Sequence, residues 1–234
     1  MGTRCAILVN PALSHQLDHA RAWRAGLKRH GVDLVVTHDR DYRADLLILS
    51  GPNYAPARKH GDNVLYIDRA YWGDPDSVSI HWLNNGEKVY TGCTAHRPHP
   101  ALMPYRTDTR RIFLADYGCK PFGRYDAVRM HPADGGAGSL QEALQGYGVA
   151  VGRRTTALVD AAIAGLVVDT DDENSPVWPI RGLKGNRGDW ITCLAWHNWS
   201  LTEIEEGDAW AYLSQQRLRQ DTPSPRQTRG YSVG

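Results

Sequence analysis

The segment 129–170 reads RMHPADGGAGSLQEALQGYGVAVGRRTTALVDAAIAGLVVDT, and its order of apolar runs and helix-like stretches decides the fold. Strands are predicted at 149–151 and 166–169, with a helix at 156–164 between them and a short helix at 140–144 before them. Uninterrupted apolar strands are typical of a parallel sheet that helices cover on both faces. The segment therefore predicts one α/β half, in which a helix begins directly after a strand.

A run of small, basic and hydroxyl residues stands at the start of that helix. Gly152 permits a sharp turn, Arg153 and Arg154 follow it, and Thr155 and Thr156 open the helix. Free backbone N–H groups and the helix dipole make such an N-terminus favourable for an anion. Two hydroxyls alone would be read as a helix cap, but two adjacent guanidiniums are better placed beside an anion. The pattern predicts a site for a phosphate or a diphosphate, with a simple cap as the alternative.

Two further polar residues are predicted beside this phosphate site. Asp160 lies one helical turn after Thr156, where its carboxylate can accept hydrogen bonds from ribose hydroxyls. His131 precedes Pro132 at the end of a strand predicted at 126–130, and histidine suits a donor to a phosphate or to a leaving group. The alternatives are a solvated acid and a histidine satisfied within a turn.

A second set of α/β elements precedes this segment. Residues 16–30 are predicted as an amphipathic helix with Leu17, Ala20, Trp23 and Leu27 on its apolar face. The strands expected in this half lie at 5–9, 32–37, 45–49 and 63–67, with short irregular strands near 77–80 and 88–91. Ligands of such sheets bind beyond the carboxyl ends of the strands, so two facing halves predict a site in the cleft between them.

The expected fold class is α/β, with two facing Rossmann-like, doubly wound domains and a helical C-terminal segment. The proline-bearing stretch 94–108 lacks periodicity and is the best candidate for a linker. Helices are predicted at about 188–199 and 202–213, the second with a capping box of Thr202 and Glu205. The predicted divisions are a first domain at 1–95, a linker at 96–110, a second domain at 111–213 and a flexible tail at 214–234.

The first half offers candidates for a general base, which a transfer to an acceptor hydroxyl requires. Asp68 stands at the carboxyl end of the strand predicted at 63–67, where a catalytic base would be placed. His15 and Asp18 follow the first strand and are nearly as well placed. The sequence leaves the choice among these three residues open.

Composition and motifs narrow the classes of function. The net charge of +1 gives no global basic field that would indicate nucleic acid, although a local basic cleft is compatible with it. The four cysteines lack metal-ligand spacing, and the acidic run 171–175 is typical of a solvated loop, so no metal is expected. No stretch approaches the roughly 18 apolar residues of a membrane span, and a cytoplasmic location with reduced thiols is expected. Neither G-x-G-x-x-G nor a P-loop pattern occurs, which argues against dinucleotide dehydrogenases and P-loop kinases.

The aromatic residues are unevenly chosen: the chain holds eight tryptophans and eleven tyrosines but two phenylalanines. Tryptophan and tyrosine favour surfaces that are apolar on one side and wet on the other. Some of them could line a groove in which a base or a sugar ring stacks, with core packing as the alternative.

The order of these motifs resembles the nucleotide-binding half of GT-B glycosyltransferases. His131-Pro132 matches a His-Pro element, Thr155-Thr156 matches a paired-hydroxyl element, and Asp160 stands where many members of this group have a glutamate. The segments YIDRAYWGD at 66–74 and DWITCLAWHNWSLTEIEEGDAW at 189–210 also resemble small glycosyltransferase-like proteins of bacteriophages.

The resemblance implies transfer of a sugar from a nucleotide-sugar, with a UDP-sugar favoured, to an acceptor hydroxyl without an essential metal or a further cofactor. In a phage setting the acceptor would be a 5-hydroxymethylpyrimidine of the phage DNA, modified in the host cytoplasm. The arginines that could then contact DNA phosphates are Arg97, Arg106, Arg110, Arg111, Arg217, Arg219, Arg226 and Arg229, with ordinary surface charge as the alternative. A non-catalytic nucleotide- or DNA-binding module and a base- or nucleoside-modifying hydrolase that uses Asp68 and His131 are the competing functions.

Overall fold

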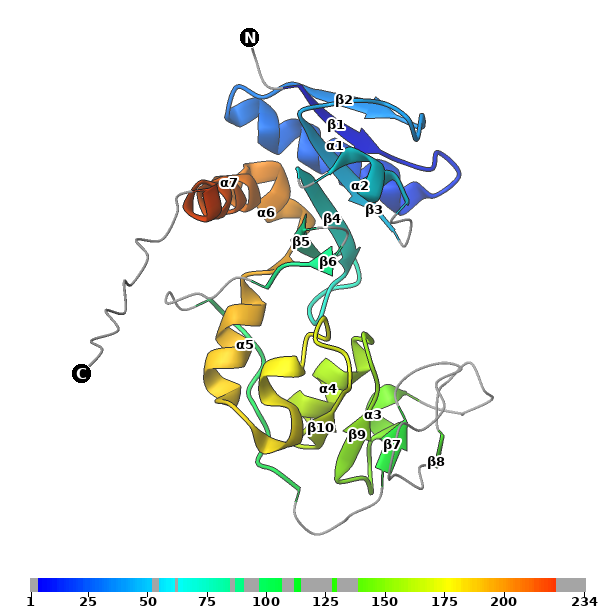
Figure 1. Ribbon diagram of the computed structural model, residues 1–234, viewed down its shortest axis with the longest axis vertical. Helices are drawn as coiled ribbons and strands as arrows, with labels where there is room; N and C mark the ends of the chain where they lie inside the picture. Colours follow the sequence, from blue (N-terminus) through cyan, green and yellow to red (C-terminus); the bar gives the residue numbers. More distant parts are fainter. Residues whose placement is uncertain are drawn as a thin grey trace, which may run out of the picture.

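The computed structural model shows a mixed α/β protein with two sheets, one around β1–β5 and one around β7–β10 (Figure 1). The residues that it describes are 4–51, 55–61, 63–84, 87–90, 97–106, 112–114, 128–129 and 139–221. No helix in this part of the chain is long and apolar enough to cross a membrane.

The larger sheet is mostly parallel and has seven strands among the described residues, in the order β11-β5-β4-β3-β1-β2, with β6 beside β5. The parallel strands are β1 (Cys5–Leu8), β2 (Leu34–Thr37), β3 (Leu46–Ser50) and β4 (Val64–Arg69). The antiparallel strands are β5 (Val78–Asn84), β6 (Glu87–Lys88) and β11 (Asn198–Trp199).

The expectation of short irregular strands near 77–80 and 88–91 was wrong for the first of them. β5 is a regular strand of seven residues in which all but the last residue are buried. It runs antiparallel to β4, so the sheet is mixed and not fully parallel.

Helices cover both faces of this sheet, as expected for a doubly wound arrangement. One face packs on α1 (Ser14–Arg29), α6 (Leu201–Glu206) and α7 (Asp208–Asp221), and the other packs on α2 (Ala55–His60). The predicted apolar face of α1 is confirmed: Ala20, Trp23 and Leu27 are buried in the core, and Leu17 is partly buried and packs against it. α1 and α6 cross closely at Gly26, where a Cβ atom would overlap the carbonyl oxygen of Ile204.

The smaller sheet is parallel and has the order β10-β9-β7-β8 in the described part. Its strands are β7 (Ile112–Leu114), β8 (Val128–Arg129), β9 (Val149–Val151) and β10 (Val167–Asp169). The helices that accompany it are α3 (Leu140–Ala143), α4 (Ala157–Ile163), the 3-10 helix η2 (Trp178–Leu183) and α5 (Arg187–Ala195). A second apolar core, centred on Leu158, Val168 and Ile191, holds these elements together.

The C-terminal helices differ from their predicted form. The capping box belongs to Ser200 and Glu203 and not to Thr202 and Glu205, so α6 starts one residue earlier than expected. α6 then ends at Gly207, which has the left-handed φ of 88° that glycine tolerates. α7 continues to Asp221, so the stretch predicted as a flexible tail from residue 214 begins as helix, and residues 222–234 lie outside the described part.

The chain returns to the larger sheet after α5. β11 pairs with β5, and α6 and α7 pack on α1 (Figure 1), although the sequence grouped residues 198–213 with the second domain. The described part of the predicted linker, 97–106, has no regular secondary structure and bonds to the smaller half through Met103 N–H and the Ile163 carbonyl at 2.9 Å. The division into two GT-B-like domains stays a prediction.

Candidate functional site

Two adjacent pockets lie around the end of β4 and the loop 70–77 that follows it. We call them the inter-sheet pocket, with a volume of about 920 Å³, and the sheet-edge pocket, with a volume of about 640 Å³. The residues that line both of them are Arg69, Pro75 and Ser77. A ligand that fills one pocket therefore ends close to the other.

The inter-sheet pocket is built by both halves of the molecule. Loop 70–77 extends from the carboxyl end of β4 toward α4 (Figure 1), and the start of α4 follows the carboxyl end of β9. Thr155, Thr156 and Asp160 line this pocket, so the structure brings together three residues that the sequence had singled out. The carboxyl ends of strands from both sheets thus meet at one pocket, and open α/β sheets bind their ligands beyond the carboxyl ends of their strands.

Asp160 has an unusual environment in this pocket. Burial raises the pKa of its carboxyl group from 3.8 to about 6, and the positive charge of the nearby Arg69 opposes the increase. The Arg69 side chain is exposed, and no ion pair to it is formed by the described residues. Asp160 and Arg69 therefore line the same pocket. The carboxyl group of Asp160 changes its charge near pH 6, whereas the guanidinium of Arg69 is always charged.

The two threonines are bound mainly to their own helix. Thr155 Oγ1 accepts a hydrogen bond from the Ala157 N–H at 3.2 Å, which is the local cap that the sequence allowed as an alternative. Thr156 has helical backbone angles and makes no capping bond with its side chain. Its hydroxyl is therefore the better placed of the two for a ligand.

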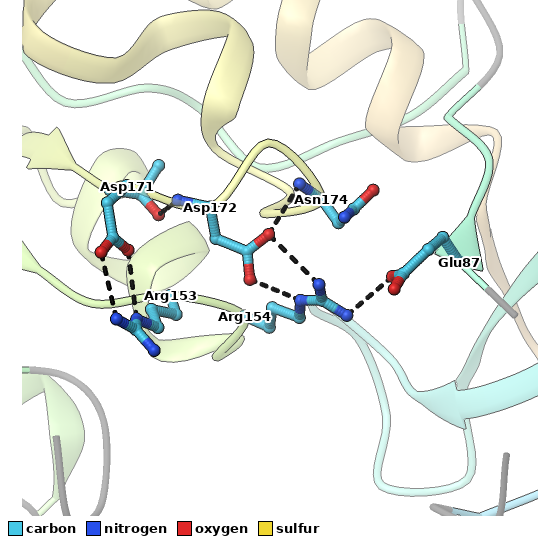
Figure 2. A network of polar contacts seen from close by, with 7 residues as sticks. Glu87, Arg153, Arg154, Asp171, Asp172 and Asn174 are labelled. Carbon is cyan, nitrogen blue, oxygen red and sulfur yellow. Dashed lines mark hydrogen bonds and ion pairs between the residues drawn. The ribbon is translucent and has the colours of Figure 1, made fainter.

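Arg153 and Arg154 have carboxylate partners within the protein (Figure 2). Arg153 donates two hydrogen bonds to Asp171, each of 3.1 Å. Arg154 donates to Asp172 at 2.5 Å and to Glu87 of β6 at 2.7 Å, and the hydrogen bond to Asp172 raises the pKa of its guanidinium. The anions beside this basic pair are thus supplied by the loop after β10 and by the larger sheet, and neither arginine lines the inter-sheet pocket.

The acidic loop at 171–172 is therefore a counter-charge for these arginines and not simply a solvated run. A phosphate could reach Arg153 or Arg154 only by exchanging with these carboxylates, so their role in nucleotide binding stays a prediction. His131 lies outside the described residues.

The sheet-edge pocket collects all three candidates for the general base, because His15, Asp18 and Asp68 line it together. Asp68 Oδ2 accepts a hydrogen bond from the Lys88 ammonium at 2.7 Å, and Asp68 Oδ1 accepts one from the backbone N–H of Arg69 at 2.8 Å. Asp18 forms an ion pair of 2.6 Å with Arg21, one turn further along α1. His15 is exposed on the same helix.

Sequence reasoning did not select His19 and Ser50, which form a hydrogen bond in this pocket. His19 Nδ1 lies 3.0 Å from Ser50 Oγ, and the His19 side chain is only 8% exposed. Burial and the neighbouring His15 lower the pKa of His19 to about 4, so its ring is neutral at pH 7. The available signal was the spacing of His15 and His19, which are four residues apart and therefore lie on one face of a helix.

Arg69 and Trp72 were assigned no role from the sequence, although both come soon after the predicted strand end. Both line the inter-sheet pocket. The signal for them was position, because every residue in a short loop after a parallel strand lies near the carboxyl edge of the sheet.

Three of the eight arginines expected to contact DNA have described side chains, and all three form bonds within the protein. Arg97 donates to Glu203 at 2.6 Å and to the Asn198 carbonyl at 2.9 Å, and lies 3.9 Å from the ring centre of Trp199. Arg106 donates to the Leu144 carbonyl at 2.7 Å, and Arg217 donates to Asn63 at 3.0 Å. The residues of this set whose side chains fall outside the described part are Arg110, Arg111, Arg219, Arg226 and Arg229. Arg97, Arg106 and Arg217 are thus explained by packing within the protein.

Within the described ranges, no three histidine, cysteine or acidic side chains are grouped so that they could hold a metal ion. The metal-free chemistry that the sequence suggested stays a prediction. In comparisons with known proteins, no family model, no curated protein and no solved structure matches the chain.

Proposed function

We propose that the protein is a glycosyltransferase that moves a sugar from a nucleotide-sugar, preferably a UDP-sugar, to an acceptor hydroxyl. The observation that carries the proposal is the inter-sheet pocket, which loops from the carboxyl ends of β4 and β9 line together. It holds an exposed guanidinium, a threonine hydroxyl and a half-buried carboxylate, which are the groups that a nucleoside diphosphate requires.

In this proposal the diphosphate lies beside Arg69 and Thr156. The guanidinium stabilises the negative charge that develops on the leaving nucleoside diphosphate, and the hydroxyl donates a hydrogen bond to a phosphate oxygen. Asp160 accepts hydrogen bonds from the ribose hydroxyls. Arg69 takes the role that the sequence had given to Arg153 and Arg154, because those two guanidiniums already have carboxylate partners.

The acceptor hydroxyl enters from the sheet-edge pocket, and Asp68 removes its proton. The acceptor oxygen forms a bond to the anomeric carbon while the bond from that carbon to the diphosphate oxygen breaks, and the acceptor proton passes to Asp68. Asp68 is the best candidate because it directly precedes Arg69, which lines both pockets, whereas Asp18 lies on α1 and lines the sheet-edge pocket alone. Lys88 holds Asp68 in position through the bond of 2.7 Å.

The first test is binding of UDP, measured by calorimetry and thermal shift on the full chain. UDP at 100 times its Kd should stabilise the wild type by about 2.7 kcal/mol. Arg69→Ala should lose this stabilisation, while Arg58→Ala, an exposed arginine of α2, should keep it. A wild type that binds no nucleoside diphosphate would refute the donor site.

The second test is turnover, followed by mass spectrometry of the acceptor. With a UDP-sugar and DNA that contains 5-hydroxymethylpyrimidine, the wild type should add one sugar residue per modified base. Asp68→Asn should bind UDP as the wild type does and lose turnover, while Asp41→Asn, an exposed acid paired with Lys59, should keep both. Labelling of lipid or protein in place of DNA would change the acceptor, and nucleotide binding without turnover on any of them would favour a binding module.

A further inference from the structure

The inter-sheet pocket has an apolar wall that the groups for ribose and phosphate do not use. Trp72, Leu140 and Ala157 line it, and all three are partly buried residues that pack on the core of the smaller half. The polar groups described above, Arg69, Thr156 and Asp160, line the same pocket. A pocket with one polar and one apolar part suits a ligand that is built in the same way. A nucleotide is such a ligand, because its base is planar and largely apolar and its ribose and phosphates are polar.

Trp72 is the aromatic residue at this wall, and its main chain is firmly held. The Asn198 side chain accepts a hydrogen bond from the Tyr71 N–H and donates one to the Trp72 carbonyl, both of 2.9 Å. β11, which carries Asn198 and pairs with β5, thereby fixes the loop between β4 and β5. The indole is thus offered to the pocket from a fixed backbone, while its surface is only partly covered.

The neighbouring side chain adds to this rigidity. Tyr71 is only 4% exposed, and its hydroxyl lies 3.1 Å from His81 Nε2 and 3.2 Å from the Tyr90 hydroxyl. The rings of Tyr71 and Trp72 are tilted against each other with centres 6.2 Å apart. Little conformational entropy would be lost when a second ring packs on the free part of the indole.

We propose that the base of the donor nucleotide stacks on Trp72, with the ribose at Asp160 and the diphosphate at Arg69. The inference rests on the proposed function and deepens it. The base is the planar part of the nucleotide and has two π faces, so it gains most from an indole, whereas ribose and diphosphate need the polar part of the pocket. Trp72, from the loop of the larger sheet, would then contribute to donor recognition together with residues of the smaller half.

The test separates the base from the rest of the nucleotide. The Kd of UDP and of ribose 5-diphosphate, which has no base, is measured by calorimetry for the wild type, Trp72→Phe and Trp72→Leu. Loss of the stacked ring should weaken UDP about tenfold in Trp72→Leu and leave ribose 5-diphosphate unchanged. Trp72→Phe should retain most of the affinity for UDP, since a smaller ring still stacks. Trp178→Leu, the same change at a half-buried tryptophan of η2, is the control and should not alter either Kd.

Several outcomes would overturn the inference. Equal weakening of both ligands in Trp72→Leu would mean a general structural effect, and no weakening of either would mean that the base lies elsewhere. In both cases a wild type that binds UDP leaves the proposed donor site intact. A wild type that binds neither ligand, and none of ADP, CDP or GDP, refutes the donor site and the stacking together.

A spectroscopic measurement guards against misfolding of the leucine variant. UDP should quench the tryptophan fluorescence of the wild type, and Trp72→Phe, which retains a ring, should lose that part of the quenching. Quenching that is unchanged in Trp72→Phe, in a protein that still binds UDP, would contradict stacking on this residue.

Discussion

Replacing Asp160 with asparagine should stabilise the ligand-free protein, and the gain should increase with pH. Burial raises the pKa of this carboxyl group from 3.8 to about 6. In the unfolded chain the group ionises at its ordinary pKa, so the folded state binds the proton more tightly. The stabilisation that Asp160 contributes is therefore fully present below about pH 3.8 and is lost as the pH rises to about 6. Above that range the loss is constant, because the group is ionised in both states.

The size of the effect follows from the difference between the ordinary pKa of 3.8 and the pKa of about 6 in the folded protein, which corresponds to about 3 kcal/mol at most. Asparagine has nearly the same shape and no charge to bury, so Asp160→Asn should recover most of this amount near pH 8. For a chain of this size the expected increase in Tm is roughly 6–12 °C. Near pH 4.5 the stabilisation by Asp160→Asn should be smaller by about 2 kcal/mol, because the wild-type carboxyl group is still mostly protonated in the folded protein at that pH.

The assay is thermal and urea unfolding of the wild type and Asp160→Asn at about pH 4.5 and pH 8 without nucleotide. Asp33→Asn, an exposed acid before β2, is the matched control and should leave the stability unchanged at both pH values. Destabilisation by Asp160→Asn at pH 8 would refute the reasoning, because it would mean that Arg69 holds the carboxylate in a net favourable ion pair. The same variant should bind UDP more weakly, as expected when a binding site is kept at the expense of stability.

Three other changes test separate parts of the structure. Arg154→Ala should weaken UDP binding far less than Arg69→Ala, measured by calorimetry, since Arg154 already pairs with protein carboxylates; the opposite order would restore the original phosphate site. Gly26→Ala should lower the free energy of unfolding by about 1–3 kcal/mol, because its methyl group would overlap the Ile204 carbonyl and separate α1 from α6; unchanged urea unfolding would contradict that close crossing. Ser200→Ala should lower it by about 1 kcal/mol through loss of the capping box, and an unaltered midpoint would show that the cap is dispensable.

The parallel strands were readable from the sequence because each is a short, unbroken apolar run. Val149–Val151 is such a run, and the strand occupies the predicted residues. β5 was recognised only in part, since SIHWLN mixes polar and apolar residues. Its polar residues Ser79 and His81 are buried, and His81 Nε2 lies 3.1 Å from the hydroxyl of Tyr71. The sequence of β5 itself does not reveal Tyr71 as this partner, because Tyr71 lies in the loop after β4.

The candidate site was predictable where it depends on strand ends and not where it depends on long-range charge pairs. Asp68, His15 and Asp18 meet in one pocket because the carboxyl ends of parallel strands share an edge. Arg154 was expected to need an external anion, but its partner Asp172 comes 18 residues later, and its partner Glu87 comes 67 residues earlier. The pairing with Asp172 depends on β9 and β10 lying side by side in one sheet, and the pairing with Glu87 depends on how the two sheets are placed.

The return of the last helices to the first sheet has a consequence for synthesis on the ribosome. β5 borders β11, and the Trp82 indole donates a hydrogen bond of 3.1 Å to the Leu213 carbonyl, 131 residues further along the chain. The nascent larger sheet therefore leaves the ribosome with the start of β5 unpaired and one face of α1 uncovered until β11, α6 and α7 emerge. Native folding of this half should therefore wait until residues 198–213 have left the ribosome. Protease resistance of the larger sheet should be low in a nascent chain halted before residue 198 and should appear once residue 213 has emerged.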